Sequence, residues 1–312
     1  MGQLQTTNTP YDDVFRTLLN DCSPLILPLI NEVFDEAYTG TETILFSPNE
    51  HFLNRQDGKE EERITDSSFK ILGKETKKYH LECQSSSDSS MLIRFFEYDT
   101  QIALDEGELA GNILTVTFPH SAVLFLRCQA STPDKLKIRM VTPGGQVEYP
   151  IPVMKSQQYT IEQIFDKNLL LLIPFHIFSH EKRLAEYEKD ISKREALQKE
   201  YKQIREKLEE LLERGILSEY TKRTLIDLSN KVLDHIAVKY NSVRKGVKSV
   251  MGGRVLDYEA KKIKREGIEQ GIEQGIRGTV SILRNLGVPP QTILLQIQEQ
   301  YNLSPEASAK YL

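Results

Sequence analysis

The sequence is poor in cysteine and in long apolar runs. Three cysteines occur in 312 residues, Cys22, Cys83 and Cys128, and none has a Cys-x-x-Cys or Cys/His spacing. A disulfide framework and a structural zinc site are therefore not expected. The longest apolar stretch, residues 169–178, is about half the length of a membrane-spanning helix. The first ten residues contain neither an apolar run nor a basic flank, so no secretory signal is expected. These absences predict a soluble, cytoplasmic protein with no membrane partner.

The chain also has no overall excess of basic residues, with 40 Lys and Arg against 45 Asp and Glu and a formal net charge of −5. Taken alone, this total argues against a nucleic-acid-binding protein. The charge is unevenly distributed, however. Residues 1–65 contain twelve acidic and four basic side chains, whereas residues 231–265 contain ten basic and three acidic ones. A local basic stretch can contact a polyanion whatever the total charge. Its densest part makes Arg244, Lys245 and Lys248 candidates for phosphate contacts, with a solubilising helix face as the alternative.

The first 155 residues alternate between helical and strand-like patterns. Helices are expected from Asp12 or Asp13 and from Ser23-Pro24, where Pro28 indicates a kink or a later start. A third helix is expected along the apolar stripe between Met91 and Ala103. Strands are expected at 43–46, 63–72, 78–84, 113–118, 122–127, 136–141 and 147–153, the last two joined by a hairpin at 142–145. The order α-β-β-β-α-β predicts a mixed central sheet with helices on its faces.

After residue 160 the pattern becomes helical. Apolar residues recur at three- and four-residue steps within 181–214, which predicts a solvated helix packing one seam on a neighbour; a dimer seam, and hence a homo-oligomer, is the alternative. A Gly-Ile-Glu-Gln tetrapeptide repeats from Gly267 and indicates a linker. The length allows about two domains. We divide the chain into an α/β domain (1–180), a charged helical region (181–265), a glycine-rich linker (266–278) and a small helical segment (279–312).

The segment between residues 79 and 84 is the most informative for chemistry. As a strand it directs Tyr79, Leu81 and Cys83 to one face and His80, Glu82 and Gln84 to the other, although an exposed surface strand gives the same alternation. The expected strand before it contains Asp66, and Asp is disfavoured in strands. Two adjacent strands can bring Asp66 and Glu82 to the same side. Converging carboxylates repel each other and are relieved by a divalent cation, and oxygen ligands suit Mg²⁺ or Mn²⁺.

These features resemble the PD-(D/E)XK nuclease core, and more closely its transposase-like, recombination-promoting (Rpn) branch. The resemblance covers residues 11–180 well and the rest loosely. It rests on residues 11–16, Thr65-Asp66, residues 81–84, Arg94 with Tyr98, residues 164–175 and the Gly-Ile-Glu-Gln repeat. It implies a restriction-endonuclease-like αβββαβ core with a mixed central sheet, followed by an all-α C-terminal region. It also implies a bacterial, metal-dependent endonuclease that cleaves double-stranded DNA and is linked to mobile elements or genome defence.

The resemblance assigns a role to several residues of this chain. Asp66 and Glu82 would bind the metal, and the backbone carbonyl of Cys83 could also reach it. Gln84 stands where many relatives have lysine, so it could orient the attacking water but supplies no positive charge. Asp13 could add an acidic ligand, with an N-terminal helix cap as the alternative.

Two residues of the expected third helix complete this set. The resemblance places Arg94 beside the site, where its guanidinium can hold a phosphate and offset the missing lysine, with a position on a solvated helix face as the alternative. Tyr98 lies on the same polar stripe one turn later. The histidines at 51, 80, 120, 176 and 235 show no metal-ligand spacing, and His180 only follows His176 by four residues. His80 is expected to be an ordinary strand residue, with a contact to water or phosphate as the alternative. The Cys83 side chain is expected to fill the core.

Two other interpretations stay open at this point. A relative that has lost catalysis would still fold and bind DNA or protein, and Gln84 keeps this alternative open, whereas intact Asp66 and Glu82 argue against it. A helical assembly protein, with the α/β part as a scaffold, belongs to another class.

Overall fold

The computed structural model describes residues 10–46, 50–54, 60–64, 67–85, 90–252, 275–276, 278–280, 282–284, 288–301 and 308–311. Side chains are described in these ranges except at 50–54, 60–64, 299–301 and 309. The chain divides into two compact units, one ending at Gly253 and the other beginning at Arg254. We describe each unit by itself.

A mixed sheet of six strands forms the centre of the first unit. Its first three strands in space are antiparallel neighbours, and the third, fourth and fifth are parallel. The last strand closes an antiparallel hairpin through the turn predicted at 142–145. The spatial order is β1 (Thr43–Phe46), β4 (Ser67–Leu72), β5 (Thr76–Gln84), β8 (His120–Phe125), β10 (Gly145–Lys155) and β9 (Lys135–Thr142). The predicted mixed α/β class with a mixed central sheet is confirmed.

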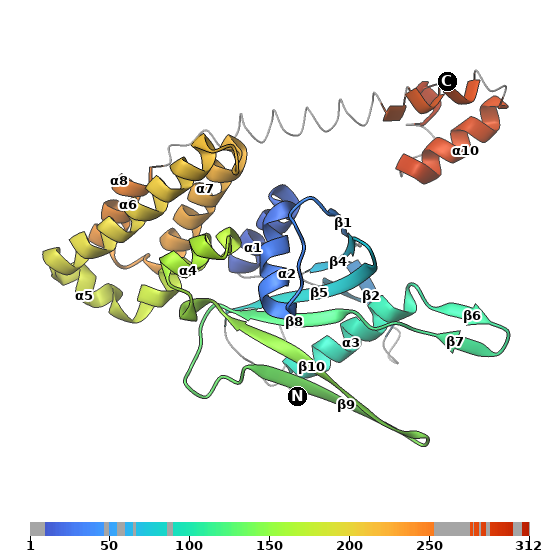
Figure 1. Ribbon diagram of the computed structural model, residues 1–312, viewed down its shortest axis with the longest axis horizontal. Coiled ribbons are helices and arrows are strands. Elements are labelled where there is room, and N and C mark those ends of the chain that lie inside the picture. The colour runs from blue at the N-terminus through green and yellow to red at the C-terminus, as the bar shows by residue number, and fades with distance from the viewer. Residues whose placement is uncertain are drawn as a thin grey trace. The chain divides into compact units, whose positions relative to one another are not determined.

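Helices cover both faces of this sheet (Figure 1). On one face lie α1 (Pro10–Asp21) and α2 (Ile26–Phe34), joined by the 3₁₀ turn η1 (Ser23–Leu25), and on the other lies α3 (Met91–Leu104). Pro28 falls in the first turn of α2, where its missing N–H has no intrahelical partner to lose. This is the later helix start that the sequence predicts.

Strand alternation distributes side chains between two cores. Tyr79, Leu81 and Cys83 of β5 join the larger core beneath α1 and α2. Val123 and Phe125 of β8 join a smaller core formed with α3, β9 and β10. Successive strand residues point to opposite faces, so His80 and Glu82, which alternate with these three residues, face α3.

Two predicted strands differ from those observed. The stretch 63–72 is not one strand: β3 (Glu60–Ile64) pairs with β2 (Glu50–Asn54) in a separate ribbon, and β4 begins at Ser67. Three consecutive glutamates in β3 are too costly to place in a buried sheet, whereas Ser67–Leu72 is mostly buried. Likewise, the stretch 113–118 yields only β7 (Ile113–Thr115), paired with β6 (Glu108–Ala110). Pro119 lacks a backbone donor and separates it from β8.

The helices after the sheet belong to the same core. They are η2 (Ser156–Gln158), α4 (Ile161–Asp166), η3 (Leu170–Arg183), α5 (Leu184–Lys189), α6 (Ile191–Glu213), α7 (Glu219–Ile236) and α8 (Asn241–Met251). In the predicted seam of α6, Leu197, Tyr201, Ile204 and Leu208 are buried and Leu211 is partly buried. Helix α6 packs on α8 and α7. The seam is thus covered within the chain. One cluster of buried apolar residues runs from α1 through α8, so the core continues across the expected boundary at residue 180.

The second unit has a small core of its own. Ile276, Val280, Ile293 and Ile297 are buried together there. Its described elements include α10 (Pro290–Tyr301) and η4 (Ala309–Tyr311). Most of the expected linker, residues 266–274 and 277, lies outside the described residues. Within the part of the chain that the structure describes, no helix combines the length and apolar character needed to cross a membrane.

Candidate functional site

A fully buried histidine stands at the centre of a polar network beneath α3. The Nδ1 atom of His80, on β5, lies 2.7 Å from Asp99 Oδ1, and its Nε2 atom lies 3.2 Å from Glu82 Oε1. Burial alone would lower the pKa of His80, but its hydrogen bonds to Asp99 and Glu82 raise the pKa to about 9. His80 is therefore an imidazolium at neutral pH and donates from both ring nitrogens. The prediction that it is an ordinary strand residue is wrong.

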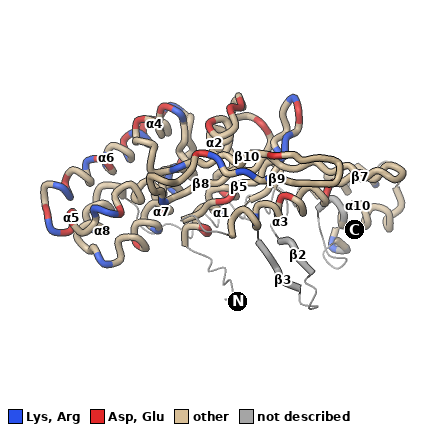
Figure 2. Tube along the Cα trace, turned by 90° about the horizontal axis from the view of Figure 1, so that it is seen from below, with Lys and Arg blue, Asp and Glu red and all other residues tan. Residues whose placement is uncertain are grey.

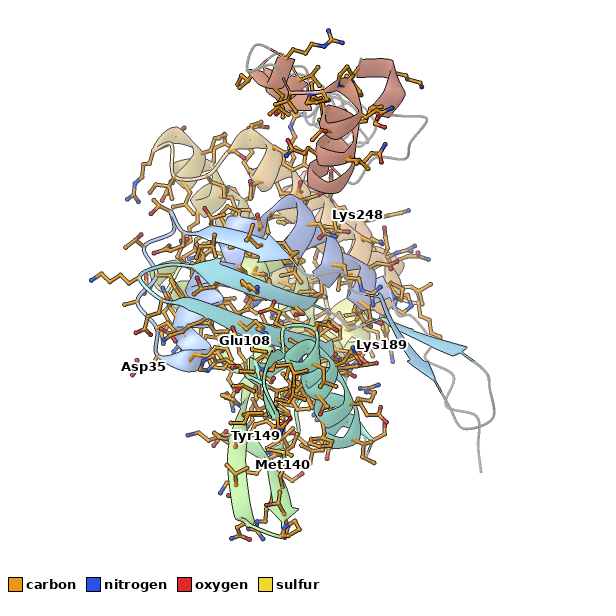
Figure 3. All side chains as sticks on the ribbon, turned by 90° about the vertical axis from the view of Figure 1, so that its right-hand side faces the viewer. Asp35, Glu108, Met140, Tyr149, Lys189 and Lys248 are labelled. Atoms are coloured by element: carbon orange, nitrogen blue, oxygen red, sulfur yellow. The ribbon has the colours of Figure 1, made fainter. Side chains whose placement is uncertain are left out.

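Asp99 is the acceptor that His80, Ser121 and Tyr149 share in this network. Its Oδ1 atom accepts a second hydrogen bond from Ser121 Oγ of β8 at 2.7 Å, and its Oδ2 atom accepts one from the Tyr149 hydroxyl of β10 at 3.3 Å. Figure 3 shows Tyr149 on the ribbon of the β9–β10 hairpin, beside α3. Asp99 and His80 are both 0% exposed. The carboxylate thus ties α3 to three strands of the sheet.

Glu82 is 5% exposed, whereas His80 and Asp99 are 0% exposed. Its Oε2 atom accepts a hydrogen bond from Gln84 Nε2 at 3.0 Å, while its Oε1 atom faces His80. Burial would raise the pKa of Glu82, but the hydrogen bond and charge of His80, together with the charge of Arg94, hold the pKa below its ordinary value. Glu82 is therefore ionised at neutral pH. A carboxylate oxygen has more than one acceptor site, so Glu82 retains capacity for a further ligand.

Two α3 residues named from the sequence lie at this network. The charge of Arg94 acts on Glu82, as its effect on the pKa of that carboxyl indicates. The Tyr98 ring meets the His80 ring edge-on, with centroids 5.9 Å apart, and Phe95 contacts the same imidazole at 5.1 Å. Ser68, opposite His80 in the β4–β5 register, is fully buried, and its hydroxyl has no partner among the described residues.

The other predicted metal ligands are placed differently or lie outside the structure. Asp66, the second predicted carboxylate, lies outside the described residues, so its distance from Glu82 is untested. Asp13 lies in the first turn of α1 and is not its N-cap, because the helix begins at Pro10. Its carboxylate is exposed and lies 3.7 Å from Lys231 Nζ, on the α1 side of the sheet and apart from Glu82. The Cys83 side chain fills the core beneath α1, as predicted.

The basic residues predicted to contact phosphate lie on α8, but two of them are paired with an acid. Lys248 Nζ lies 2.6 Å from Asp234 Oδ2, and Arg244 lies 3.9 Å from Asp234 Oδ1, whereas Lys245 is exposed. Figure 2 shows basic and acidic residues interspersed along α5, α6 and α8. Most of the remaining basic stretch, from Arg254 onward, lies outside the described residues.

Sequence reasoning missed three members of the network, Asp99, Ser121 and Tyr149. One signal for Asp99 was present, because it follows Phe95 by four residues and precedes Ile102 by three. A carboxylate within the apolar stripe of a helix is expensive to bury unless it has a partner. Ser121 and Tyr149 gave no comparable signal, since only the assembled sheet brings their strands beside α3.

A second polar group was also missed. Among the described residues, His176, His180 and Glu200 place one ligand atom each within 4.8 Å of one another. The sequence indicated this group only through the four-residue step from His176 to His180 and gave no sign of Glu200.

In comparisons with known proteins, no protein-family model, curated protein or solved structure matches the chain. Function is therefore inferred from the residues and geometry given above.

Proposed function

We propose that the chain is a metal-dependent endodeoxyribonuclease of the PD-(D/E)XK type, similar to the recombination-promoting Rpn branch, with Glu82 and Gln84 in its active site. The observation that carries this proposal is the position of Glu82 on β5: ionised, nearly buried, held by His80 and Gln84, and close to the charge of Arg94. A carboxylate fixed in this way is suited to bind a divalent cation, because little ordering remains to be done on binding.

The order of elements supports the same proposal. The elements α2, β1, β4, β5, α3 and β8 follow one another in an order compatible with the proposed αβββαβ core, with the β2–β3 ribbon inserted before β4 and the β6–β7 ribbon before β8. α3 connects the parallel neighbours β5 and β8 and covers the face that carries Glu82. The proposed site therefore lies beneath a crossover helix.

Charge balance indicates what a metal at Glu82 requires. Among the described residues of the network, Asp99 and Glu82 are anionic while His80 and Arg94 are cationic, so the network is already neutral. A divalent cation here needs another carboxylate. Asp66 fits this need by its place in the sequence, since it directly precedes Ser67, and Ser67 pairs with Leu81, the residue before Glu82. The Cys83 carbonyl would be a third oxygen ligand.

The proposed reaction is hydrolysis of a phosphodiester bond. A bound Mg²⁺ or Mn²⁺ supplies Lewis acidity toward the phosphate and the attacking water. The protein residues have separate tasks. His80 and Asp99 hold Glu82 ionised and oriented. Gln84 donates to Glu82 through Nε2, which leaves its Oε1 atom able to accept a hydrogen bond from a water. Arg94 can hold a phosphate oxygen in place of the missing lysine.

The test is cleavage of supercoiled plasmid with Mg²⁺, Mn²⁺ or EDTA. The wild-type chain should nick or linearise the DNA with either metal and not with EDTA. Glu82→Gln and Asp66→Asn should reduce the rate by at least about 100-fold, the size of effect seen when an electrostatic catalytic group is lost. The matched control is Glu148→Gln, which makes the same change at an exposed carboxylate paired with Lys137 and Arg139. The proposal would be refuted if the wild-type chain left the plasmid intact, or if Glu82→Gln cleaved it at the same rate.

A non-catalytic DNA- or protein-binding relative is the second candidate. The engagement of both Glu82 oxygens by His80 and Gln84 favours it, because each hydrogen bond must coexist with a metal or be broken. On this alternative the wild-type chain binds DNA fragments but leaves them uncut in both metals. The helical assembly alternative has less support, since the α6 seam is buried within the chain.

A further inference from the structure

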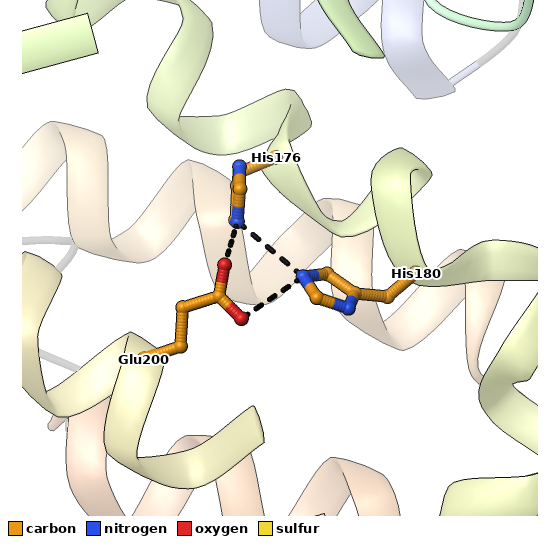
Figure 4. A group of neighbouring side chains, drawn as sticks. All are labelled: His176, His180 and Glu200. Carbon is orange, nitrogen blue, oxygen red and sulfur yellow. Dashed lines mark hydrogen bonds and ion pairs between the residues drawn. The ribbon is translucent and has the colours of Figure 1, made fainter. Parts of the chain in front are cut away.

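Two histidines and a glutamate converge at the contact between η3 and α6 (Figure 4). His176 Nε2 lies 2.8 Å from Glu200 Oε1, and His180 Nε2 lies 3.2 Å from Glu200 Oε2. The two Nε2 atoms lie 3.4 Å apart. All three side chains therefore direct a potential ligand atom toward one point.

We propose that His176, His180 and Glu200 bind one Zn²⁺ ion, with the fourth position taken by water. With Zn–N bonds of about 2.0–2.1 Å, two nitrogens of a tetrahedral site lie about 3.3–3.4 Å apart. The observed separation of the two Nε2 atoms matches this edge. The two nitrogen–oxygen distances are slightly shorter, so an ion at the centre requires only a small outward movement of the Glu200 carboxylate.

The ligand types select the class of metal. Two imidazoles and one carboxylate are the set found in open zinc sites, whereas Mg²⁺ takes oxygen ligands. This preference separates the site from the one proposed at Glu82, and the zinc proposal does not depend on nuclease activity. We expected no zinc site from the low number of cysteines, but that number bears only on zinc sites built from cysteine.

The surroundings support one binding tautomer. The Tyr187 hydroxyl lies 3.1 Å from His180 Nδ1, so His180 can donate from Nδ1 to Tyr187 while Nε2 binds the metal. One neighbour opposes binding: an Arg183 nitrogen lies 3.3 Å from the same Nδ1 atom. That contact is incompatible with an Nδ1–H, so metal binding should release Arg183. Its guanidinium already lies over the Tyr187 ring, 5.4 Å from the centroid, and can remain there.

Exposure indicates where the open position lies. The side chains of His176 and His180 are 5% and 8% exposed, whereas that of Glu200 is 31% exposed. Solvent therefore reaches the group from the Glu200 side, and a fourth ligand can enter there. Because η3 follows the sheet and α6 belongs to the helical region, a shared ion would fasten these two parts of the first unit together.

The experiment measures metal binding by the full-length chain after EDTA treatment and removal of the chelator. Co²⁺ titration should produce the visible absorption of a four-coordinate site at one ion per chain, and Zn²⁺ should displace it. Zn²⁺ should also raise the unfolding midpoint, while the same concentration of Mg²⁺ should not. His176→Gln, His180→Gln and Glu200→Gln should each abolish the Co²⁺ signal, whereas His120→Gln, at an exposed histidine outside the group, should leave it unchanged.

A further variant tests the proposal even if the variants that remove a metal ligand do not fold. Tyr187→Phe keeps all three ligands and should weaken Co²⁺ binding by about 10-fold, because His180 loses its orienting partner. Circular dichroism of each variant checks folding before titration. Absence of a Co²⁺ signal in the folded wild-type chain, or a signal retained in folded His176→Gln, would overturn the proposal. A signal that disappears only when Cys128 is replaced would assign the ion to that thiol and overturn it equally.

Discussion

The His80 imidazole and the Asp99 carboxylate, 2.7 Å apart and both fully buried, connect the central strand β5 to α3 across the sheet surface. Hydrogen bonds from Ser121 and Tyr149 to the same carboxylate extend the connection to β8 and β10. A buried carboxylate with three partners contributes to stability only while every partner remains. The first two predictions follow from this arrangement.

Replacing Asp99 should strongly destabilise the fold. Asp99→Asn leaves the His80 cation without its nearest counter-charge in a fully buried site, and we expect a loss of about 3 kcal/mol in the free energy of unfolding. The matched control is Asp105→Asn, at the exposed end of the same helix, which should change the free energy of unfolding by no more than about 0.5 kcal/mol. Urea denaturation measures both. Equal midpoints for the two variants would contradict the importance of the network.

Stability should decrease from neutral to alkaline pH because of His80. Its pKa is raised from 6.5 to about 9 in the folded protein, so the contribution is complete below pH 6.5 and is lost as pH rises through 9. The full effect corresponds to about 3 kcal/mol. The measurement is the difference in urea stability between the wild-type chain and His80→Gln, in EDTA, from pH 6 to pH 9.5. A difference that stays constant over this range would show that His80 does not change its charge there.

Arg127 should not be replaceable by lysine. Its guanidinium donates two hydrogen bonds to Glu181, at 2.6 and 2.7 Å, and lies over the Phe178 ring, 4.7 Å from the centroid. Lysine keeps the charge but lacks the planar fork, so Arg127→Lys should cost about 1–2 kcal/mol of unfolding free energy. The exposed Arg139→Lys is the control and should be nearly neutral by thermal denaturation. A neutral Arg127→Lys would indicate that charge alone suffices.

Truncation should reveal that the α/β part does not fold without the following helices. A chain ending at residue 180 loses the buried apolar faces of α6, α7 and α8, which pack into the same core as α1. We expect it to be aggregated or unfolded, whereas a chain ending at Gly253 should be soluble and cooperative. Size-exclusion chromatography and thermal unfolding compare the two. A monomeric, cooperatively unfolding 1–180 fragment would contradict the shared core.

Under the proposed function, the basic residues of α8 should contribute unequally to DNA binding. Lys245 is exposed, whereas Lys248 is paired with Asp234. Lys245→Ala should therefore reduce the slope of log affinity against log salt by up to about 0.9, the effect of one phosphate contact. Lys248→Ala should change it less. Identical slopes for both variants and the wild-type chain would remove α8 from the DNA interface.

The parts of the fold that the sequence predicts best are those set by local periodicity. Helix α3 and strand β5 were located from the three-to-four-residue and two-residue spacing of their apolar side chains. The division of 63–72 between β3 and β4 was missed because periodicity does not indicate which partner a strand chooses. Strand pairing depends on burial of the assembled sheet, and the glutamates of β3 are excluded from it.

The candidate site was predictable only in part, for a related reason. Glu82 and Gln84 were identified because they share a strand face, and Arg94 because of the resemblance. Asp99 could have been identified only if a carboxylate within the apolar stripe of a helix had been taken to indicate a buried partner. His176 and His180 were not treated as metal ligands because their four-residue step was the only spacing signal that the sequence offered. They also lie in η3, where three residues per turn do not bring residues four apart onto one face. Only tertiary packing brings Glu200 to them.

The strict alternation along β5 constrains how this segment can change over time. Tyr79, Leu81 and Cys83 pack beneath α1, while His80 and Glu82 face α3, so inserting or deleting one residue would exchange the two sets. Imidazole and carboxylate would then meet the apolar core, and tyrosine and leucine would meet Asp99. Different substitutions in β5 can disturb the packing slightly or strongly, whereas any one-residue change in its length exchanges the two faces. Insertions and deletions in diverging sequences should therefore collect in the turns on either side of the strand and be absent within it.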